Sequence, residues 1–432
     1  MSAFASGLSP ARGHPRPTAL ADRVRLNRLS AQPPHQFDHS PTVPNPDPFG
    51  PSMDRVLVTG GAGFIGSHTV DLLVEKGYQV RILDSLQERV HPRGWPSYLP
   101  ESVERVHGDV CDRRALASAL EGVSCVLHLA AYQDYMPDFS TFYRVNTVST
   151  ALLFELIVEG RLPIEKVVLA SSQAVYGEGK YLCPACGPVY PTFRSEEKLS
   201  GGDWEVRCPH CSGAVEPQPI DESTVSPHTA YGISKYALEL TALNLGRKYG
   251  IAAVNMRYSI VQGPRNSFYN AYSGIARRFT LRLLAEEPPV CYEDGQQIRD
   301  YVHVHDVARA NLLVLEDPRA DYRSFNVGGL TSTRVLEFAR LLSRICGVEI
   351  EPMISGEYRF GDTRHTFSSW DSLAKLGWRP ENGLETILTD YVDWVRAQGT
   401  AGIWDFYADS ERRMKSMGIV RASSSSAGGG ST

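Results

Sequence analysis

The sequence predicts an α/β protein with a doubly wound parallel sheet, a smaller C-terminal domain and a cysteine-rich insert. Three observations carry this prediction. Apolar strands alternate with helix-like segments from residue 55 onward, a glycine-rich turn joins the first strand to the first helix, and two Cys-x2-Cys pairs interrupt the alternation. Strands that alternate with helices imply a parallel sheet covered by helices on both faces.

Composition narrows the class of protein and the kinds of partner. A chain of 432 residues has room for two or three domains, and 42% hydrophobic and 22% charged residues are ordinary for a globular protein. A net charge of −5 gives no support for nucleic acid or an anionic membrane as a partner, and no apolar run approaches the length of a membrane span. Eight cysteines, four of them in tight pairs, suggest a reducing compartment, so we expect a cytoplasmic protein.

Both ends of the chain differ from the rest in composition. Residues 1–52 contain ten prolines, several arginines and little apolar periodicity, so we expect a disordered tail. An organelle transit peptide is the alternative, although the prolines argue against an amphipathic helix. Met53 stands directly before the first strand and would serve as a start residue. Residues 422–432 are rich in serine and glycine and should also be disordered.

The glycine-rich turn lies between Arg55 and Asp84, in the order strand, turn, helix, strand. Gly60 would permit the tight turn, Gly63 would let the backbone approach a pyrophosphate, and Gly66 would let the helix pack closely on the sheet. The helix N-terminus would then receive the phosphate charge. A glycine turn without a ligand is the alternative, but the acid 18 residues after Gly66 favours a bound dinucleotide.

The alternation continues through most of the chain. After a second strand at 79–83, we expect strands at 103–106, 125–129, 167–170, 252–258 and 324–327, helices at 113–120, 139–158, 230–248, 272–286, 333–345 and 383–397, and a strand end followed by a helix at 301–315. Ligands of such sheets bind beyond the carboxyl ends of the strands. Asp109, Ala130 and Ser172 fall at such ends.

Residues 178–219 interrupt the pattern and carry Cys183, Cys186, Cys208 and Cys211. Two Cys-x2-Cys pairs separated by 21 residues can close a tetrahedral thiolate site, most simply for a structural zinc ion. Four reduced thiols, or two disulfides in a secreted protein, are the alternatives. His210 could replace one sulfur ligand. The insert would lie near the pocket, either as a lid or as a dimer contact.

Tyr231 and Lys235 are four residues apart at the start of a predicted helix and therefore share one face. A neighbouring ammonium stabilises a phenolate and moves the phenol toward a pKa that is useful for proton transfer. An ordinary amphipathic pair is the alternative. Behind a dinucleotide motif, and with Ser172 at a strand end, the pattern indicates a catalytic group of Ser172, Tyr231 and Lys235.

At this point the chain resembles a known family. The run Gly60-Gly-Ala-Gly63-Phe-Ile-Gly66, followed by the Leu129-Ala-Ala131 and Tyr231-Gly-Ile-Ser-Lys235 runs, is similar to the extended short-chain dehydrogenase/reductases, which have a Rossmann-type sheet. The 295–304 run around Arg299 and the segment from Arg359 to Asp362 narrow the resemblance to the nucleotide-sugar epimerases and dehydratases. The resemblance covers residues 54–397.

The resemblance implies an NAD cofactor, a nucleoside-diphosphate sugar as substrate, and transient oxidation at C4 of the sugar. Asp84 should bind the adenosine ribose and repel a 2′-phosphate, so we expect NAD over NADP; Arg89 is the nearest arginine that could favour the phosphate. Arg299 and Arg359 would contact the substrate diphosphate, although surface salt bridges are the alternative for each. The remaining residues expected to bind the cofactor are Gly60, Gly63, Phe64, Ile65, Gly66, Asp109, Val110, Leu129, Ala130, Ala131, Tyr231 and Lys235.

The residues after the serine separate the branches of this family. The 4,6-dehydratases that resemble this chain place an Asp and a Glu at positions 173 and 174, whereas here Gln173 and Ala174 offer neither an acid nor a base. This leaves 4-epimerisation, with simple reduction as the alternative. Ile260 stands where related epimerases often have an asparagine that touches the nucleotide.

Three further segments resemble a bacterial subgroup, the dTDP-L-rhamnose 4-epimerases. They are the insert, the run at 132–137 and the run at 269–274. A UDP-sugar epimerase, or an NAD-binding regulator or scaffold with a zinc-ribbon module, are the other hypotheses. We expect a homodimer in which residues 53–258 form the NAD-binding domain, 178–219 the insert, and 259–421 mainly the substrate domain, with 298–328 packing back on the first.

Overall fold

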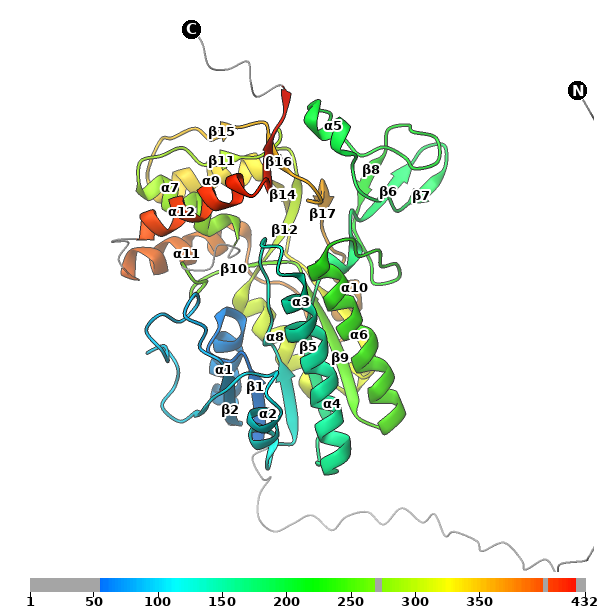
Figure 1. Ribbon diagram of the computed structural model, residues 1–432, viewed down its shortest axis with the longest axis vertical. Helices are drawn as coiled ribbons and strands as arrows, with labels where there is room; N and C mark the ends of the chain where they lie inside the picture. Colours follow the sequence, from blue (N-terminus) through cyan, green and yellow to red (C-terminus); the bar gives the residue numbers. More distant parts are fainter. Residues whose placement is uncertain (1–54, 269–273, 399–402, 425–432) are drawn as a thin grey trace, which may run out of the picture. The chain divides into compact units, whose positions relative to one another are not determined.

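The computed structural model describes residues 55–268, 274–398 and 403–424 (Figure 1). The predictions for residues 1–52 and for most of the run at 269–274 lie outside these residues. Within them, no helix combines the length and the apolar character that crossing a membrane requires.

The centre of the fold is a seven-stranded sheet with the order β13-β9-β5-β4-β1-β2-β3. Every neighbouring pair is parallel. The strands β1, β2, β4 and β5 are rich in valine, leucine and isoleucine, as is typical of strands with both faces buried. The strands are β1 Arg55–Thr59, β2 Gln79–Asp84, β3 Glu104–His107, β4 Cys125–His128, β5 Lys166–Ser172, β9 Ala252–Tyr258 and β13 Arg323–Val327.

Helices cover both faces of this sheet. On one face, α1 (Phe64–Glu75) and α8 (Val304–Glu316) pack their apolar sides into a core that includes Leu73 and Val307. On the other face, α2 (Arg113–Leu120), α4 (Ser149–Gly160) and α6 (Ala230–Tyr249) form a second core with Leu153 and Leu238. Figure 1 shows α4 and α6 side by side. The predicted doubly wound α/β fold is confirmed.

The single helix predicted at 139–158 is divided in the structure. Its parts are α3 (Phe139–Phe142), a π-helical segment (Tyr143–Val148) and α4. Asn146 lies in the π segment with its side chain fully buried and hydrogen-bonded. Such π segments are frequent at functional sites, and Asn146 contacts the catalytic helix, as described below.

The second half of the chain forms a smaller layer beside the carboxyl ends of the strands. Its core lies between α7, α9 and α11 and contains Phe279, Phe338 and Tyr391. Its elements are β10 Ile260–Gln262, α7 Ile275–Leu284, β11 Val290–Cys291, β12 Ile298–His303, β14 Ser332–Arg334, α9 Val335–Cys346, β15 Met353–Ile354, β16 Glu357–Arg359, β17 His365–Thr366 and α11 Leu384–Gln398. The 3-10 turn Pro318–Ala320 and α10 (Asp371–Ala374) instead pack into the core of the central sheet through Ala320 and Leu373.

Two further elements follow that the sequence did not predict. They are α12 (Ile403–Ser416) and β18 (Val420–Ala422), and β18 pairs antiparallel with β16. Ser423 is also buried. The predicted boundary of the disordered tail at residue 422 is therefore too early, because β18 includes Ala422 and Ser423 is buried.

The insert forms a small structure of its own. Strand β6 (Lys180–Cys183) pairs with β7 (Gly187–Val189) and β8 (Glu216–Gln218), and a short helix, α5 (Glu196–Ser200), follows β7. Tyr181, Val189, Val206 and the sulfur-bearing side chains of Cys183 and Cys208 make its core. In Figure 1 the insert lies next to β17, and a backbone bridge between Ile220 and Ser368 joins these regions.

Candidate active site

A cavity of about 610 Å³ lies at the carboxyl ends of the central strands. It is lined both by residues expected to bind the cofactor and by residues expected to act on the substrate. Ser172, Arg299 and Arg359 line it, and Lys235 lies behind its wall, 1% exposed. The expected cofactor residues that line it are Gly60, Gly63, Phe64, Ile65, Gly66, Asp84, Asp109, Val110, Leu129, Ala130, Ala131 and Tyr231.

The glycine turn has the geometry that a pyrophosphate requires. Gly60 has a φ of +68°, and a side chain there would meet Ala130 backbone atoms at 2.8 Å. A Cβ on Gly66 would lie only 2.1 Å from the Gly60 carbonyl oxygen, so α1 can approach the strand only with glycine at this position. The N-terminus of α1 carries no side-chain cap and faces the cavity through Gly63 and Phe64. The turn therefore fits a phosphate group at a helix N-terminus.

Asp84 ends β2 at the cavity wall, where its carboxylate accepts hydrogen bonds from the backbone N–H groups of Ala62 at 3.1 Å and Leu86 at 2.9 Å. These bonds fix a negative group where the adenosine ribose would lie. Arg89, the first arginine after Asp84 in the sequence, forms a 2.5 Å ion pair with Asp134 and stacks on Tyr132. The arrangement fits NAD, since Arg89 already has a carboxylate partner.

The first turn of α6 positions Tyr231, the residue predicted to be the proton acceptor. Thr229 caps this helix by accepting a hydrogen bond from the Gly232 N–H at 3.0 Å, so Tyr231 and Lys235 occupy the first two turns on one face. A Cβ on Gly232 would lie 2.4 Å from the Ala174 carbonyl oxygen. Gly232 therefore permits the close contact that brings Tyr231 beside Ser172. The sequence analysis did not identify the role of Gly232. The feature that could have indicated it is a glycine in the first turn of a predicted helix.

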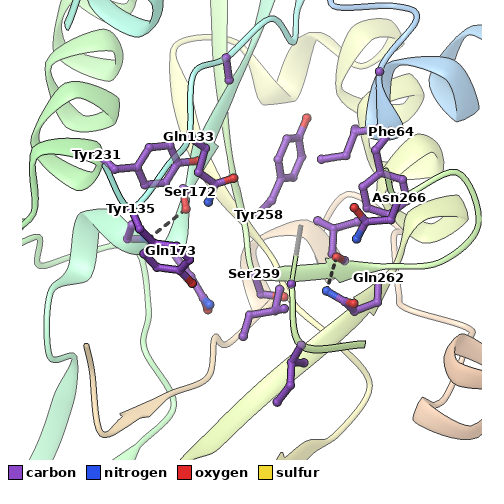
Figure 2. A pocket seen from close by; sticks show the side chains of 18 of the residues that line it. Phe64, Gln133, Tyr135, Ser172, Gln173, Tyr231, Tyr258, Ser259, Gln262 and Asn266 are labelled. Atoms are coloured by element: carbon purple, nitrogen blue, oxygen red, sulfur yellow. Dashed lines mark hydrogen bonds between the residues drawn. The ribbon is translucent and has the colours of Figure 1, made fainter. Parts of the chain in front are cut away.

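Figure 2 shows Tyr231, Ser172 and Gln133 next to one another on one side of the pocket, with Phe64 and Asn266 on the other side. Burial raises the pKa of Tyr231 to about 12, and a hydrogen bond with Ser172 acts in the opposite direction. The phenol is thus protonated at neutral pH until positive charge stabilises the phenolate.

Lys235 supplies such a charge from behind the tyrosine. Its Nζ lies 5.8 Å from the centre of the Tyr231 ring and donates to the Ala170 carbonyl oxygen at 2.8 Å. Burial lowers the pKa of Lys235 to about 7, while the Glu239 carboxylate raises it. Because Nζ has further hydrogen-bond donors, Lys235 can also bind a ribose hydroxyl.

Asn146 is a second residue that sequence reasoning missed. Its side chain donates to the Tyr132 carbonyl oxygen and to the Ser234 hydroxyl, both at 3.0 Å, and accepts from the Tyr132 N–H at 2.9 Å. These bonds tie the segment after β4 to α6, at Ser234 between Tyr231 and Lys235. The feature of the sequence that could have indicated Asn146 is a polar residue within an otherwise apolar helical pattern.

Three further arginines line the cavity: Arg278, Arg299 and Arg359. We call the part of the cavity that they line the arginine-rich half, as distinct from the half with the glycine turn and Asp84. Arg359 is held between the rings of Tyr135 at 4.3 Å and Tyr292 at 5.5 Å, and its Nε donates to Asp362 at 2.7 Å. Arg299 donates to the carbonyl oxygens of residues 298, 363 and 364. The sequence did not single out Arg278, because its helix pattern alone does not show which face meets the cavity.

The structure also brings the four cysteines of the insert together. Their sulfur atoms all lie within 4.8 Å of one another, and the Cys183 and Cys211 sulfurs are 3.6 Å apart. A tetrahedron with zinc–sulfur bonds of about 2.3 Å has edges of roughly 3.8 Å. Burial opposes ionisation of Cys208, yet hydrogen bonds from the N–H groups of Cys211 and His210 lower its pKa to about 6. None of the eight cysteines, each within the part of the chain that the structure describes, forms a disulfide. The four cysteines of the insert therefore fit the ligand set of a tetrahedral metal ion.

Comparison with known proteins agrees with this geometry. A dTDP-L-rhamnose 4-epimerase of Burkholderia thailandensis is 32% identical over 351 residues, which are 79% of this chain and 94% of the relative. A putative UDP-glucose 4-epimerase of Methanocaldococcus jannaschii is 30% identical over 347 residues, 79% of this chain and 98% of the relative.

Solved structures show the same similarity. The UDP-glucose 4-epimerase of Thermotoga maritima with UDP-glucose matches with a TM-score of 0.66 and 30% identity, over 80% of this chain and 99% of that one. The Thermus thermophilus UDP-glucose 4-epimerase complex with NAD has a TM-score of 0.63 and 28% identity, over 80% and 100% of the two chains. The sequence model of the NAD dependent epimerase/dehydratase family matches residues 56–193 and 208–328. Because these residues make up more than half of the chain, the protein belongs to the NAD dependent epimerase/dehydratase family.

Proposed function

We propose that the protein is an NAD-dependent nucleotide-sugar 4-epimerase, with dTDP-L-rhamnose as the first candidate substrate. The observation that carries the proposal is one cavity that joins the glycine turn and Asp84 to Ser172, Tyr231 and the arginines. The dTDP-L-rhamnose 4-epimerase among the relatives supports the choice of sugar, and the UDP-glucose 4-epimerases make a UDP-sugar the second candidate.

In this mechanism Tyr231 takes the proton of the sugar 4-hydroxyl and Ser172 holds that oxygen by a hydrogen bond. The glycine turn and Asp84 would hold NAD, which would supply the hydride acceptor and donor for C4 of the sugar. Lys235 stabilises the phenolate that Tyr231 must become, which counters the high pKa of the buried phenol. After the 4-keto sugar has turned over, Tyr231 returns the proton to the 4-oxygen.

Two neighbouring residues favour epimerisation over loss of water. Gln173 and Ala174 both line the cavity beside Ser172, and neither side chain can donate or accept a proton as an acid or base. A dehydratase needs such groups to remove a proton from C5 and to protonate the leaving hydroxyl. The arginines in the other half of the cavity supply the positive charge that a substrate diphosphate requires.

The reaction is tested by incubating the purified protein with dTDP-L-rhamnose and, separately, UDP-glucose, and following the sugars by NMR. We expect interconversion with the C4 epimer of one of them and no stoichiometric absorbance change at the nicotinamide band. A 6-deoxy-4-keto product from a hexose substrate would indicate a dehydratase. Cofactor consumption of one per product would indicate a reductase.

We further propose that Cys183, Cys186, Cys208 and Cys211 hold a structural zinc ion. Four thiolates fill a tetrahedral shell and leave no open position for catalysis. Metal analysis of purified protein should give about one zinc per chain, and the Cys183→Ser/Cys186→Ser variant should lose the metal and unfold at a lower temperature. Cys291→Ser, which changes a buried cysteine outside the cluster, should keep the zinc. Full zinc occupancy in the double variant would overturn the assignment.

We also propose a homodimer in the cytoplasm. The exposed apolar side chains of Val148 in the π segment and of Ile233 and Leu240 on α6 support an interface along these helices, because Val148 is 54% and Leu240 47% exposed. None of the eight cysteines, all of which lie in the described residues, forms a disulfide, which supports a reducing compartment.

A further inference from the structure

A buried cluster of charges connects the insert to the arginine-rich half of the cavity. At its centre, Arg194 of the insert forms a two-pronged ion pair with Glu293, with bonds of 2.8 and 2.9 Å. Arg194 is 8% exposed and Glu293 3% exposed. Glu178 and Arg364 are further buried members of the cluster, and Glu205 and Asp294 pair with Arg364 at its more exposed edge. Buried charges of this kind persist only when they are paired.

Glu293 is the member of the cluster that lines the cavity. Its backbone has a φ of +54°, in the left-handed region that strains a residue with a side chain and suits glycine. Arg194 and Arg364 bind its carboxylate, the latter at 3.0 Å. A strained backbone that keeps a carboxylate in the wall points to a role for this side chain.

Arg194 also reaches the segment that carries the substrate arginine. Its Nη2 donates to the Asp362 carbonyl oxygen at 2.9 Å, and its Nη1 donates to the Trp204 carbonyl oxygen at 2.9 Å. The Asp362 carboxylate in turn accepts hydrogen bonds from Arg359, whose Nη2 is 2.6 Å away. Arg194 is therefore linked to Arg359, which lines the cavity, through the single residue Asp362.

The insert acts on the cavity from outside. None of residues 178–219, all of which the structure describes, lines the cavity, although Gly177 and His228 on either side do. The family match stops at residue 193 and resumes at 208, so Arg194 and Glu205 lie in a part of this chain that the family model leaves unmatched. The general fold of the family does not therefore explain the Arg194–Glu293 pair.

We propose that Arg194 is a positioning residue through which the insert prepares the site for a nucleoside diphosphate. Together with Arg364 it neutralises Glu293, so that the cavity wall does not present excess negative charge to a diphosphate, and it fixes the Asp362 backbone so that Arg359 stays aimed into the cavity. The inference rests on the proposed function, because it takes the arginine-rich half of the cavity to bind the substrate diphosphate.

The test is Arg194→Met, a change that keeps much of the side-chain length and removes the charge. In calorimetric titrations of the full-length protein, we expect the affinity for dTDP or UDP, whichever the wild type binds, to fall by at least about tenfold, because the buried Glu293 then loses one of its two arginine partners and the Asp362 backbone loses its anchor. NAD affinity should stay within about twofold, since the glycine turn and Asp84 lie in the other half of the cavity. In turnover, KM for the sugar should rise more than kcat falls.

Two variants separate positioning from general damage to the insert. Arg207→Met removes an exposed arginine of the same insert and should leave both affinities unchanged. Arg194→Met/Glu293→Gln also removes the carboxylate charge that Arg194 helped to neutralise, so it should recover part of the lost nucleotide affinity. Arg194→Lys keeps the charge but not the two-pronged geometry, so it should lie between the wild type and Arg194→Met, and it replaces Arg194→Met if that variant does not fold.

The outcomes are distinct. Unchanged nucleotide affinity in the folded Arg194 variants, or equal losses of nucleotide and NAD affinity, would overturn the positioning role. If the wild type binds NAD but neither dTDP nor UDP, the proposed function itself fails and this inference fails with it.

Discussion

Replacing Tyr231 with phenylalanine should lower the turnover rate on the order of 100-fold or more while leaving NAD and nucleotide-sugar binding nearly unchanged. The substitution removes the proton acceptor next to Ser172 and little volume, and general base catalysis contributes about 10²–10⁴ to a rate. Without the phenol, the 4-hydroxyl proton has no acceptor at the helix start. The measurement compares kcat from an NMR time course with dissociation constants from calorimetry.

Tyr236→Phe is the matched control for this experiment. Tyr236 lies one turn further along the same helix and packs against the small cluster around Val175 and Tyr176, away from the residues that line the cavity. It should keep its rate within about twofold. A Tyr231→Phe enzyme that turns over as fast as the control would show that another group takes the proton, and the proposed mechanism would be wrong.

Replacing Arg257 with methionine should strongly destabilise the fold. Arg257 on β9 forms a two-pronged ion pair with Glu239 on α6, at 2.7 and 2.9 Å, and both residues are buried. Ser171, next to the catalytic serine, donates to the same carboxylate at 2.5 Å. Removing one partner of a buried pair leaves an uncompensated charge and costs about 3–5 kcal/mol of the free energy of unfolding. The midpoint of thermal or urea unfolding measures this loss.

Two control variants test whether the loss of stability comes from the buried Arg257–Glu239 ion pair. Arg113→Met breaks exposed ion pairs with Glu155 and Glu159, and it should shift the midpoint little because solvent screens such pairs. Arg257→Met/Glu239→Leu removes both buried charges and should recover much of the lost stability. Equal midpoints for the Arg257 and Arg113 single variants would show that the buried pair does not support the catalytic strand and helix.

Local sequence patterns predicted most of the nucleotide-binding half. The order strand, glycine turn, helix, strand between residues 55 and 84 agrees with β1, α1 and β2, and the predicted helix at 113–120 has the bounds of α2. These signals are strong because the residues that create them are close in sequence. A helix or strand period, a cap or a Cys-x2-Cys pair is complete within a few residues.

The elements that were mispredicted depend on distant partners. Residues 139–158 have the apolar period of one helix, yet the π segment forms where Asn146 bonds to Tyr132 and to Ser234, which lies 88 residues away. Strand β18 forms only because β16, about sixty residues earlier, offers an open edge. The local sequence pattern shows neither partner. The pattern therefore predicts one continuous helix at 139–158 and a disordered C-terminal tail from residue 422, before the end of the ordered chain.

The sequence by itself determined the α/β class, the glycine turn, the Tyr231–Lys235 pair and the spacing of the four cysteines. Only the tertiary structure decided that Gly232 brings Tyr231 beside Ser172, that Arg278 joins Arg299 and Arg359 in the cavity, and that Arg194 pairs with Glu293. The physical reason is separation along the chain. Arg194 and Glu293 are 99 residues apart, and a pairing over such a distance follows no period and is fixed only when the chain has folded.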